Sequence, residues 1–221
     1  NIVVLDGYTL NSGDLSWDEL KALGPCEIFD RTPPGEVAAR AVNAEIVITN
    51  KAPLRADTLA QLPKLRMIAV AATGYDVIDL PACRERGIAV ANIRNYALHT
   101  VPEHAFALIL ALRRSLLEYR QDVERGRRQE VDQFSFFDHP IRDLFGSTIG
   151  IFGEGVIGQG TAAIARAFGM RVLFADHAPP QSPKVEFTPF EQVLAESDII
   201  SLHCPLTPDS RNMFGPEQFR K

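Results

Sequence analysis

Three glycines and one aspartate carry the clearest chemical signal in this chain. Gly153, Gly155 and Gly158 follow a short apolar run, Thr148–Phe152, and precede an alanine-rich amphipathic stretch. A second apolar run then ends at Asp176. This order of strand, glycine turn, helix, strand and acid is the dinucleotide-binding fingerprint in its usual context.

Each part of this fingerprint has a physical role. Gly153 permits the tight turn, Gly155 lets the backbone approach a pyrophosphate, and Gly158 allows the helix to pack closely on the strand. The first helical turn offers free N–H groups and a partial positive charge to the phosphates. Asp176 can accept both ribose hydroxyls and would repel a 2′-phosphate, so we expect NAD rather than NADP. An ordinary turn with glycines for packing alone is the structural alternative, and S-adenosylmethionine is the main competing ligand.

The composition is that of a globular chain without a basic surface. The chain has 221 residues, enough for two modest α/β domains, and a net charge of −5. We therefore expect no nucleic-acid partner, and the longest apolar run, Ala105–Leu112, is too short to span a membrane. Cys26, Cys83 and Cys204 lack a CxxC pair, so we expect reduced thiols of a cytoplasmic protein and no disulfide or metal framework.

The first hundred residues alternate short apolar runs with helical patterns. This rhythm predicts an α/β fold with a parallel sheet covered on both faces, in which ligands lie beyond the carboxyl ends of the strands. The predicted strands are Ile2–Leu5, Glu27–Phe29, Glu45–Thr49, Met67–Val70 and Ala89–Ala91. The predicted helices between them are Leu15–Leu23, Gly35–Ala41, Arg55–Gln61 and Asp79–Arg86.

A helix start indicates the domain boundary. Thr100 and Glu103 have the spacing of a capping box and predict a long helix over residues 101–125. We therefore assign residues 1–98 to a first domain and residues 99–221 to the nucleotide-binding domain.

Three phenylalanines lie in the polar loop that follows this helix. Phe134, Phe136 and Phe137 indicate contact with a partner, such as a second subunit. The alternative is that they fold back onto their own domain. The loop sequence leaves both interpretations open.

The pattern continues beyond the fingerprint. We expect a surface loop over the proline-rich residues 179–183, a helix at Phe190–Glu196 and a strand at Asp198–His203. In a doubly wound sheet the first and fourth strands flank the point where the dinucleotide lies, so residues that follow this strand are expected beside it.

Several separate stretches together resemble the D-2-hydroxyacid dehydrogenase family. They are residues 70–92, 99–116, 143–158, 167–176 and 196–215. Within the family, Val70–Asp79 and Thr188–Thr207 are most similar to the hydroxypyruvate reductase and glycerate dehydrogenase branch. The resemblance implies a flavodoxin-like substrate domain, a Rossmann NAD-binding domain, a cleft between them and a homodimer.

The resemblance also implies roles for residues outside the fingerprint. Backbone N–H groups around Thr73 and Gly74 would hold a substrate carboxylate, in a loop that we expect to open a helix near Asp76. A simple turn glycine is the alternative for Gly74. Thr100 would approach the cofactor from the first turn of the long helix. Three residues would line the adenosine side: His203, Cys204 and Pro205.

Two further positions concern the binding of anions. Lys51 follows a predicted strand, where its charge could steer a small anionic 2-oxo acid, although a solvated surface lysine is an equal alternative. Val156 stands where many family members carry an arginine that grips the pyrophosphate. We therefore expect the backbone N–H groups of the turn, including those of Val156 and Ile157, to be the main phosphate contacts.

The C-terminus departs from the family pattern. The family's catalytic Arg, Glu and His lie beyond the stretch that matches residues 212–221, so we expect no catalytic residue in this chain and a truncated Rossmann domain. The fourth strand would then be an exposed apolar edge. We expect a chain that ends at Lys221 to fold poorly and to turn over no substrate.

The leading hypothesis is an NAD(H)-dependent oxidoreductase in its complete form. It would interconvert a small 2-oxo acid, of hydroxypyruvate or glyoxylate type, and its D-2-hydroxy acid. The main alternative is a non-catalytic NAD-sensing interaction protein of the same fold. A dehydrogenase that acts on formate or another small anion is a third possibility, and an S-adenosylmethionine enzyme is the fourth.

Overall fold

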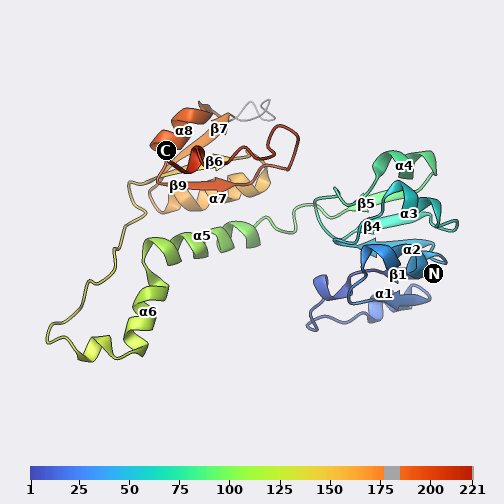
Figure 1. Ribbon diagram of the computed structural model, residues 1–221, viewed down its shortest axis with the longest axis horizontal. Helices are drawn as coiled ribbons and strands as arrows, with labels where there is room; N and C mark the ends of the chain where they lie inside the picture. The colour runs from blue at the N-terminus through green and yellow to red at the C-terminus, as the bar shows by residue number, and fades with distance from the viewer. Residues whose placement is uncertain (177–184, 221) are drawn as a thin grey trace. The chain divides into compact units, whose positions relative to one another are not determined.

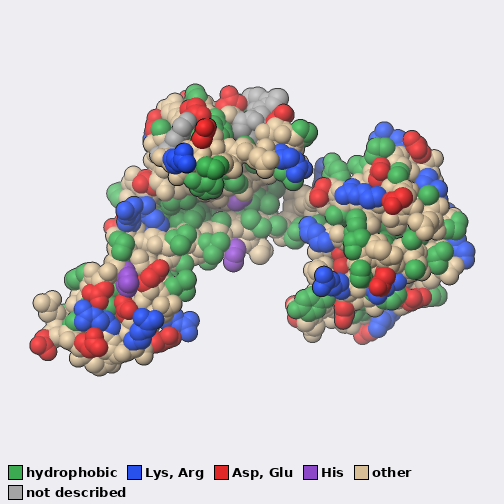
Figure 2. Space-filling model, viewed as in Figure 1, with side chains coloured by type: hydrophobic (Ala, Val, Ile, Leu, Met, Phe, Trp, Pro, Cys, Tyr) green, Lys and Arg blue, Asp and Glu red, His purple; other side chains and the backbone are tan. Residues whose placement is uncertain are grey.

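The computed structural model describes residues 1–176 and 185–220. The chain divides into two compact units, Asn1–Tyr96 and Ala97–Lys221, and Figure 1 labels most of their helices and strands. The loop expected at residues 179–183 lies outside the described residues. Within the described ranges, no helix is both long enough and apolar enough to cross a membrane. Figure 2 shows basic and acidic side chains interspersed over the visible face of each unit.

Unit 1, Asn1–Tyr96, is built around a five-stranded parallel sheet. The order β2-β1-β3-β4-β5 is the flavodoxin-like order, which confirms the predicted fold class of this part. Each strand lies within one residue of its predicted ends. The strands are β1 (Ile2–Val4), β2 (Cys26–Ile28), β3 (Ile46–Thr49), β4 (Met67–Val70) and β5 (Ala89–Asn92).

Short helices connect these strands and complete the core of unit 1. Because both faces of the sheet are covered, the strands read as nearly continuous apolar runs, and Val3, Val47 and Ile68 are fully buried. The helices are α1 (Asp18–Ala22), α2 (Val37–Ala41), α3 (Ala56–Ala60) and α4 (Leu80–Glu85), with the 3-10 turns η1 (Gly7–Thr9) and η2 (Pro34–Glu36).

Unit 2, Ala97–Lys221, contains a four-stranded parallel sheet in the order β8-β7-β6-β9. This is the order of the first four strands of a Rossmann domain. Its strands are β6 (Thr148–Phe152), β7 (Arg171–Asp176), β8 (Phe187–Pro189) and β9 (Ile199–Leu202). Its helices are α5 (Thr100–Arg113), α6 (Leu116–Glu124), α7 (Val156–Ala167) and α8 (Phe190–Glu196), with η3 (Arg127–Gln129) and η4 (Gln218–Arg220).

The central strand β6 is buried along its whole length. Ile151 packs with Phe106 of α5 and Ala162 of α7, whereas Phe152 packs with Val193 of α8. Successive side chains of a strand point to opposite faces, so helices cover β6 on both sides (Figure 1). β9 is the outer strand on this side of the order in the described residues, and Leu202 is 51% exposed.

The prediction of one long helix over residues 101–125 is wrong, because the structure has two helices, α5 and α6, in this range. Ser115 separates α5 from α6 with a left-handed φ of 47°, and its Oγ donates a hydrogen bond to the carbonyl of Pro140 at 2.7 Å. A left-handed residue interrupts the helical hydrogen-bond ladder. The predicted capping box is also wrong, because α5 begins at Thr100 itself, with His99 at the N-cap and no side-chain cap.

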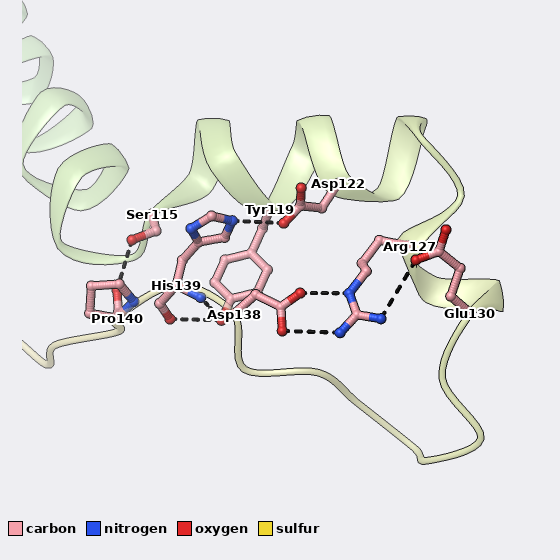
Figure 3. Close-up of polar contacts among 8 residues, drawn as sticks. All are labelled: Ser115, Tyr119, Asp122, Arg127, Glu130, Asp138, His139 and Pro140. Carbon is pink, nitrogen blue, oxygen red and sulfur yellow. Dashed lines mark hydrogen bonds and ion pairs between the residues drawn. The ribbon is translucent and has the colours of Figure 1, made fainter.

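The chain after α6 folds back onto that helix (Figure 3). The Tyr119 hydroxyl donates to the carbonyl of His139 at 2.8 Å, and the His139 ring lies 2.7 Å from the Asp122 carboxylate. Arg127 pairs with Asp138 at 2.6 Å, and this hydrogen bond lowers the pKa of the Asp138 carboxyl. These contacts give the loop a defined conformation although it has little regular structure.

The three phenylalanines of this loop lie in two different environments. Phe136 lies against Tyr119, with ring centroids 5.4 Å apart, and under the Arg127 guanidinium at 5.7 Å. Phe134 and Phe137 are 94% and 79% exposed. One ring therefore folds back onto its own unit, and two lie on the surface.

One buried carboxylate holds the carboxyl edge of the unit 1 sheet together. Asp6 follows β1, and its carboxylate accepts hydrogen bonds from the backbone N–H groups of Asn50 (2.9 Å), Lys51 and Ala52 (3.0 Å) in the loop after β3. A carboxylate with several backbone donors satisfies groups that would otherwise be buried without partners. Asp6 therefore fixes the position of the loop that carries Lys51.

We predict that Asp6→Asn destabilises the protein by about 2–3 kcal/mol, because an amide cannot replace a charged acceptor of several N–H groups. Urea denaturation followed by circular dichroism measures the loss. Asp14→Asn, an exposed position in the same unit, is the control and is expected to leave the midpoint unchanged. Equal midpoints for both variants would contradict this role of Asp6.

Candidate functional site

Two glycines of the fingerprint turn lie in close backbone contacts. Gly153 has a φ of +108°, and a Cβ there would lie 2.7 Å from the backbone nitrogen of Cys204. A Cβ at Gly158 would lie 1.9 Å from the carbonyl oxygen of Gly153. Strand β6, helix α7 and the loop after β9 thus approach one another so closely that neither of these two positions has room for a side chain.

Gly155 has the opposite environment. It is the N-cap of α7, is exposed, and a Cβ there would meet no described atom within 4 Å. Gly155 has no side chain that could cap α7, and the first N–H groups of a helix, here those of Val156, Ile157 and Gly158, have no partner within the helix. Such an open helix N-terminus, with room for a ligand at Gly155, fits the phosphates of a dinucleotide.

The strand register brings the predicted acid to the same edge as the turn. β6 pairs with β7 through Ile151 and Phe174, and continuing this register by two residues sets Gly153 level with Asp176. Asp176 ends β7 and is exposed. Its carboxylate is therefore available to a ligand at the carboxyl edge of the sheet.

The residues after β9 complete this edge on the other side of β6. Phe152 pairs with Leu202, which places Gly153 beside His203. His203 and Cys204 are half-buried, Pro205 is exposed, and burial raises the pKa of the Cys204 thiol. The structure thus brings the turn, Asp176 and this loop to one edge of one sheet.

The His203 side chain contacts two hydroxyl groups. Its Nε2 lies 3.0 Å from Thr161 Oγ1, on α7, and 2.9 Å from Ser201 Oγ, on β9. Burial lowers the pKa of the His203 imidazole, so the neutral ring is favoured. Sequence reasoning missed both hydroxyls, although the alternation of side chains along a strand already sets Ser201 and His203 on one face.

Thr100 lies in the first turn of α5, which packs beside α7. A Cβ at Gly160 of α7 would lie 2.9 Å from Pro102 Cγ and 3.2 Å from the Leu98 carbonyl oxygen. Thr100 itself is exposed and makes no side-chain cap. Its predicted role beside the cofactor stays a prediction.

The substrate loop predicted in unit 1 follows β4. Thr73 and Gly74 are exposed, and in the described part of the chain neither backbone N–H donates to another protein group. The Thr73 side chain is anchored instead, since its hydroxyl donates to the Ile93 carbonyl at 3.0 Å and Asn92 donates to the Thr73 carbonyl at 2.9 Å. The loop thus offers two free N–H groups at the carboxyl end of a strand.

The prediction that a helix begins near Asp76 is wrong. α4 begins at Leu80, and its N-cap Asp79 accepts a hydrogen bond from the Ala82 N–H at 3.1 Å. The preceding residues run as an irregular segment that pairs with Leu54 through an isolated bridge at Ile78. Any anion at this loop would therefore be held by loop N–H groups and not by a helix N-terminus.

Lys51 lies at the carboxyl end of β3 with an exposed side chain. Its backbone is fixed by Asp6, and the side chain lines a groove of about 510 Å³ with Tyr8, Arg31 and Pro33 among others. The position is compatible with a steering cation and with a solvated lysine alike.

Comparison with known proteins identifies the family. Residues 106–221 match the family model described as D-isomer specific 2-hydroxyacid dehydrogenase, NAD binding domain. The chain belongs to the D-isomer-specific 2-hydroxyacid dehydrogenases. The matched range includes the whole fingerprint and the loop after β9, so these elements are part of an NAD-binding domain of this family.

Two relatives show how much of this chain is shared. It is 51% identical to a glycerate dehydrogenase of Methylorubrum extorquens over 85% of the chain, and 39% identical to a hydroxypyruvate reductase of Blautia hydrogenotrophica over all of it. The chain spans 59% and 70% of the length of these two relatives.

Solved structures agree with the fold. A D-lactate dehydrogenase from Aquifex aeolicus, complexed with NAD and lactic acid, superimposes with a TM-score of 0.80 at 28% identity, covering 100% of this chain and 65% of that one. An acyclic imino acid reductase in complex with NADPH gives a TM-score of 0.79 at 25% identity, covering 95% of this chain and 67% of that one. These two neighbours bind different dinucleotides, so together with the NAD-binding family model they support an NAD(P) cofactor for this chain.

We predict that this protein loses stability as the pH falls below about 6.5, partly through His203. Burial holds the folded-state pKa of His203 below its unfolded value, so the unfolded chain takes up the proton first on acidification. The contribution of the neutral ring to the free energy of unfolding is complete above the unfolded-state pKa and is lost as the pH falls through the folded-state pKa. Urea midpoints at pH 7.5 and 5.5 measure the effect, which should be smaller in His203→Gln. An equal pH dependence in both proteins would contradict it.

Proposed function

We propose that this chain forms the substrate-binding and cofactor-binding parts of an NAD(H)-dependent dehydrogenase. The reaction interconverts a small 2-oxo acid, of hydroxypyruvate or glyoxylate type, and its D-2-hydroxy acid. The observation that carries the proposal is the open N-terminus of α7, where Gly155 leaves space and three N–H groups lack helical partners. The names of the relatives favour this reaction over the NAD-sensing alternative.

The dinucleotide is held mainly by backbone groups. The N–H groups of Val156, Ile157 and Gly158 donate to the pyrophosphate, and Asp176 accepts hydrogen bonds from the adenosine ribose. Because a second phosphate on that ribose would meet the Asp176 carboxylate, NAD is preferred to NADP. The loop of His203, Cys204 and Pro205 lines the adenosine side, and Thr100 approaches the cofactor from α5.

The substrate is held by unit 1. Its carboxylate accepts hydrogen bonds from the free N–H groups of Thr73 and Gly74, and the Lys51 ammonium raises the local concentration of the anion. When bound, NAD(H) supplies the hydride acceptor or donor. We assign no catalytic acid or polarising cation to residues 1–221, so these residues bind and orient the reactants.

We predict that Gly155→Ala weakens NADH binding at least tenfold, because the added methyl group occupies space that the pyrophosphate needs. Gly155 has a φ of −65°, which alanine adopts without strain, and the new Cβ meets no described atom, so stability should be unchanged. NADH fluorescence titration and a thermal melt measure the two quantities.

Gly153→Ala is the matched comparison, since its Cβ would clash with the loop after β9 and should lower stability as well. Equal NADH affinity in Gly155→Ala and the wild type would contradict the proposed site. Tighter binding of NADPH than of NADH by the wild type would contradict the role of Asp176.

We also propose that the protein is a homodimer that uses the surface of α5, α6 and the loop after α6. This region exposes Phe134 and Phe137 on a loop whose conformation is fixed by the contacts with α6, so little ordering is needed on association. Further large apolar residues are exposed on the two helices: Leu108, Leu112, Leu116, Leu117 and Val123.

We predict that the double variant Phe134→Ser with Phe137→Ser raises the dimer dissociation constant about tenfold or more, since exposed aromatic residues contribute strongly when buried at interfaces. Sedimentation over a range of concentrations measures it. Leu23→Ser, which removes an exposed apolar residue from unit 1, is the control. A wild type that is monomeric throughout, or a double variant that dimerises equally well, would refute the proposed surface.

A further inference from the structure

The His203 ring joins two elements of the dinucleotide site through one nitrogen atom. Its Nε2 contacts Thr161 Oγ1 at 3.0 Å and Ser201 Oγ at 2.9 Å. Thr161 is fully buried within α7, and Ser201 is half-buried on β9. Among the described residues, neither hydroxyl makes another hydrogen bond. Among the described residues, the His203 ring is therefore the hydrogen-bond partner of both hydroxyls.

The backbone of His203 joins the third element. Its N–H donates to the carbonyl of Phe152, at the end of β6, at 2.7 Å. A Cβ added at Gly153 would lie 2.7 Å from the carbonyl carbon of His203. A shift of His203 would therefore press on the fingerprint turn, because there is no free space between them.

The ring contacts both hydroxyls through the one nitrogen atom Nε2. A neutral imidazole nitrogen either donates one hydrogen bond or accepts one through its single lone pair, depending on the tautomer. Either tautomer leaves Nε2 between the hydroxyl of α7 and the hydroxyl of β9.

We propose that Thr161 and Ser201 are positioning residues for the dinucleotide. By fixing the ring of His203, they hold residues 203–205 against the Gly153 turn and keep the open N-terminus of α7 in its binding geometry before the cofactor arrives. A site that is already ordered loses less entropy on binding, so its ligand binds more tightly. This inference rests on the proposed function, because it concerns the same site.

Substitutions of Thr161 in the full chain test the inference. Thr161→Val keeps the shape of the side chain but removes the hydroxyl, and Thr161→Ser keeps the hydroxyl. Loss of one buried hydrogen bond should raise the dissociation constant of NADH about five- to tenfold in Thr161→Val, whereas Thr161→Ser should restore it to within about twofold of the wild type. Calorimetric titration with NADH measures these constants.

The nitrogen chemical shifts of the His203 ring provide a second measurement. The shift of Nε2 depends on the hydrogen bonds of that nitrogen, so it should change in Thr161→Val but not in Thr161→Ser. If Thr161→Val fails to fold, Ser201→Ala replaces it, because Ser201 is only half-buried and its truncation leaves the core intact. The same loss of affinity and the same change in shift are expected.

The outcomes separate the inference from the function on which it rests. No NADH binding by the wild type overturns both. NADH binding by the wild type, with an unchanged dissociation constant in Thr161→Val and Ser201→Ala, overturns the positioning role alone. Weakened binding that Thr161→Ser fails to restore also overturns it, because the effect would then follow side-chain volume and not the hydroxyl.

Discussion

The architecture of unit 2 depends on a close approach of three backbone segments that glycine alone permits. A Cβ at Gly158 would lie 1.9 Å from the Gly153 carbonyl oxygen, and one at Gly153 would lie 2.7 Å from the nitrogen of Cys204. This approach sets α7 directly on β6 and brings the loop after β9 against the turn. The free N–H groups of α7 consequently lie at the carboxyl edge of the sheet, where ligands of such folds bind.

In unit 1, a charged carboxylate fixes the loop at the carboxyl edge of the sheet. The Asp6 carboxylate collects N–H groups from the loop after β3 and so fixes Lys51, while Thr73 is anchored through the Ile93 carbonyl. In both units the candidate ligand-binding residues follow parallel strands and therefore lie at one edge of a sheet. Each edge combines anchored side chains with N–H groups that have no hydrogen-bond partner among residues 1–176 and 185–220, and such groups can bind an anion.

Much of this could be predicted from the sequence because the strands are buried on both faces and read as apolar runs. Other features depend on contacts between distant residues. The break at Ser115 depends on Pro140, and the apolar periodicity continues through it. Strand β8 has three residues and ends in a proline, so it carries no alternating pattern. The roles of Asp6 and Thr161 depend on partners 44 and 42 positions away.

The central claim is that backbone N–H groups at the start of α7 hold the dinucleotide. A crystal structure of the protein with NADH tests it most directly. The account predicts pyrophosphate oxygens within hydrogen-bond distance of the N–H groups of Val156 and Ile157, with the adenosine ribose on Asp176. A dinucleotide bound elsewhere, or one whose pyrophosphate is held only by side chains, would contradict it.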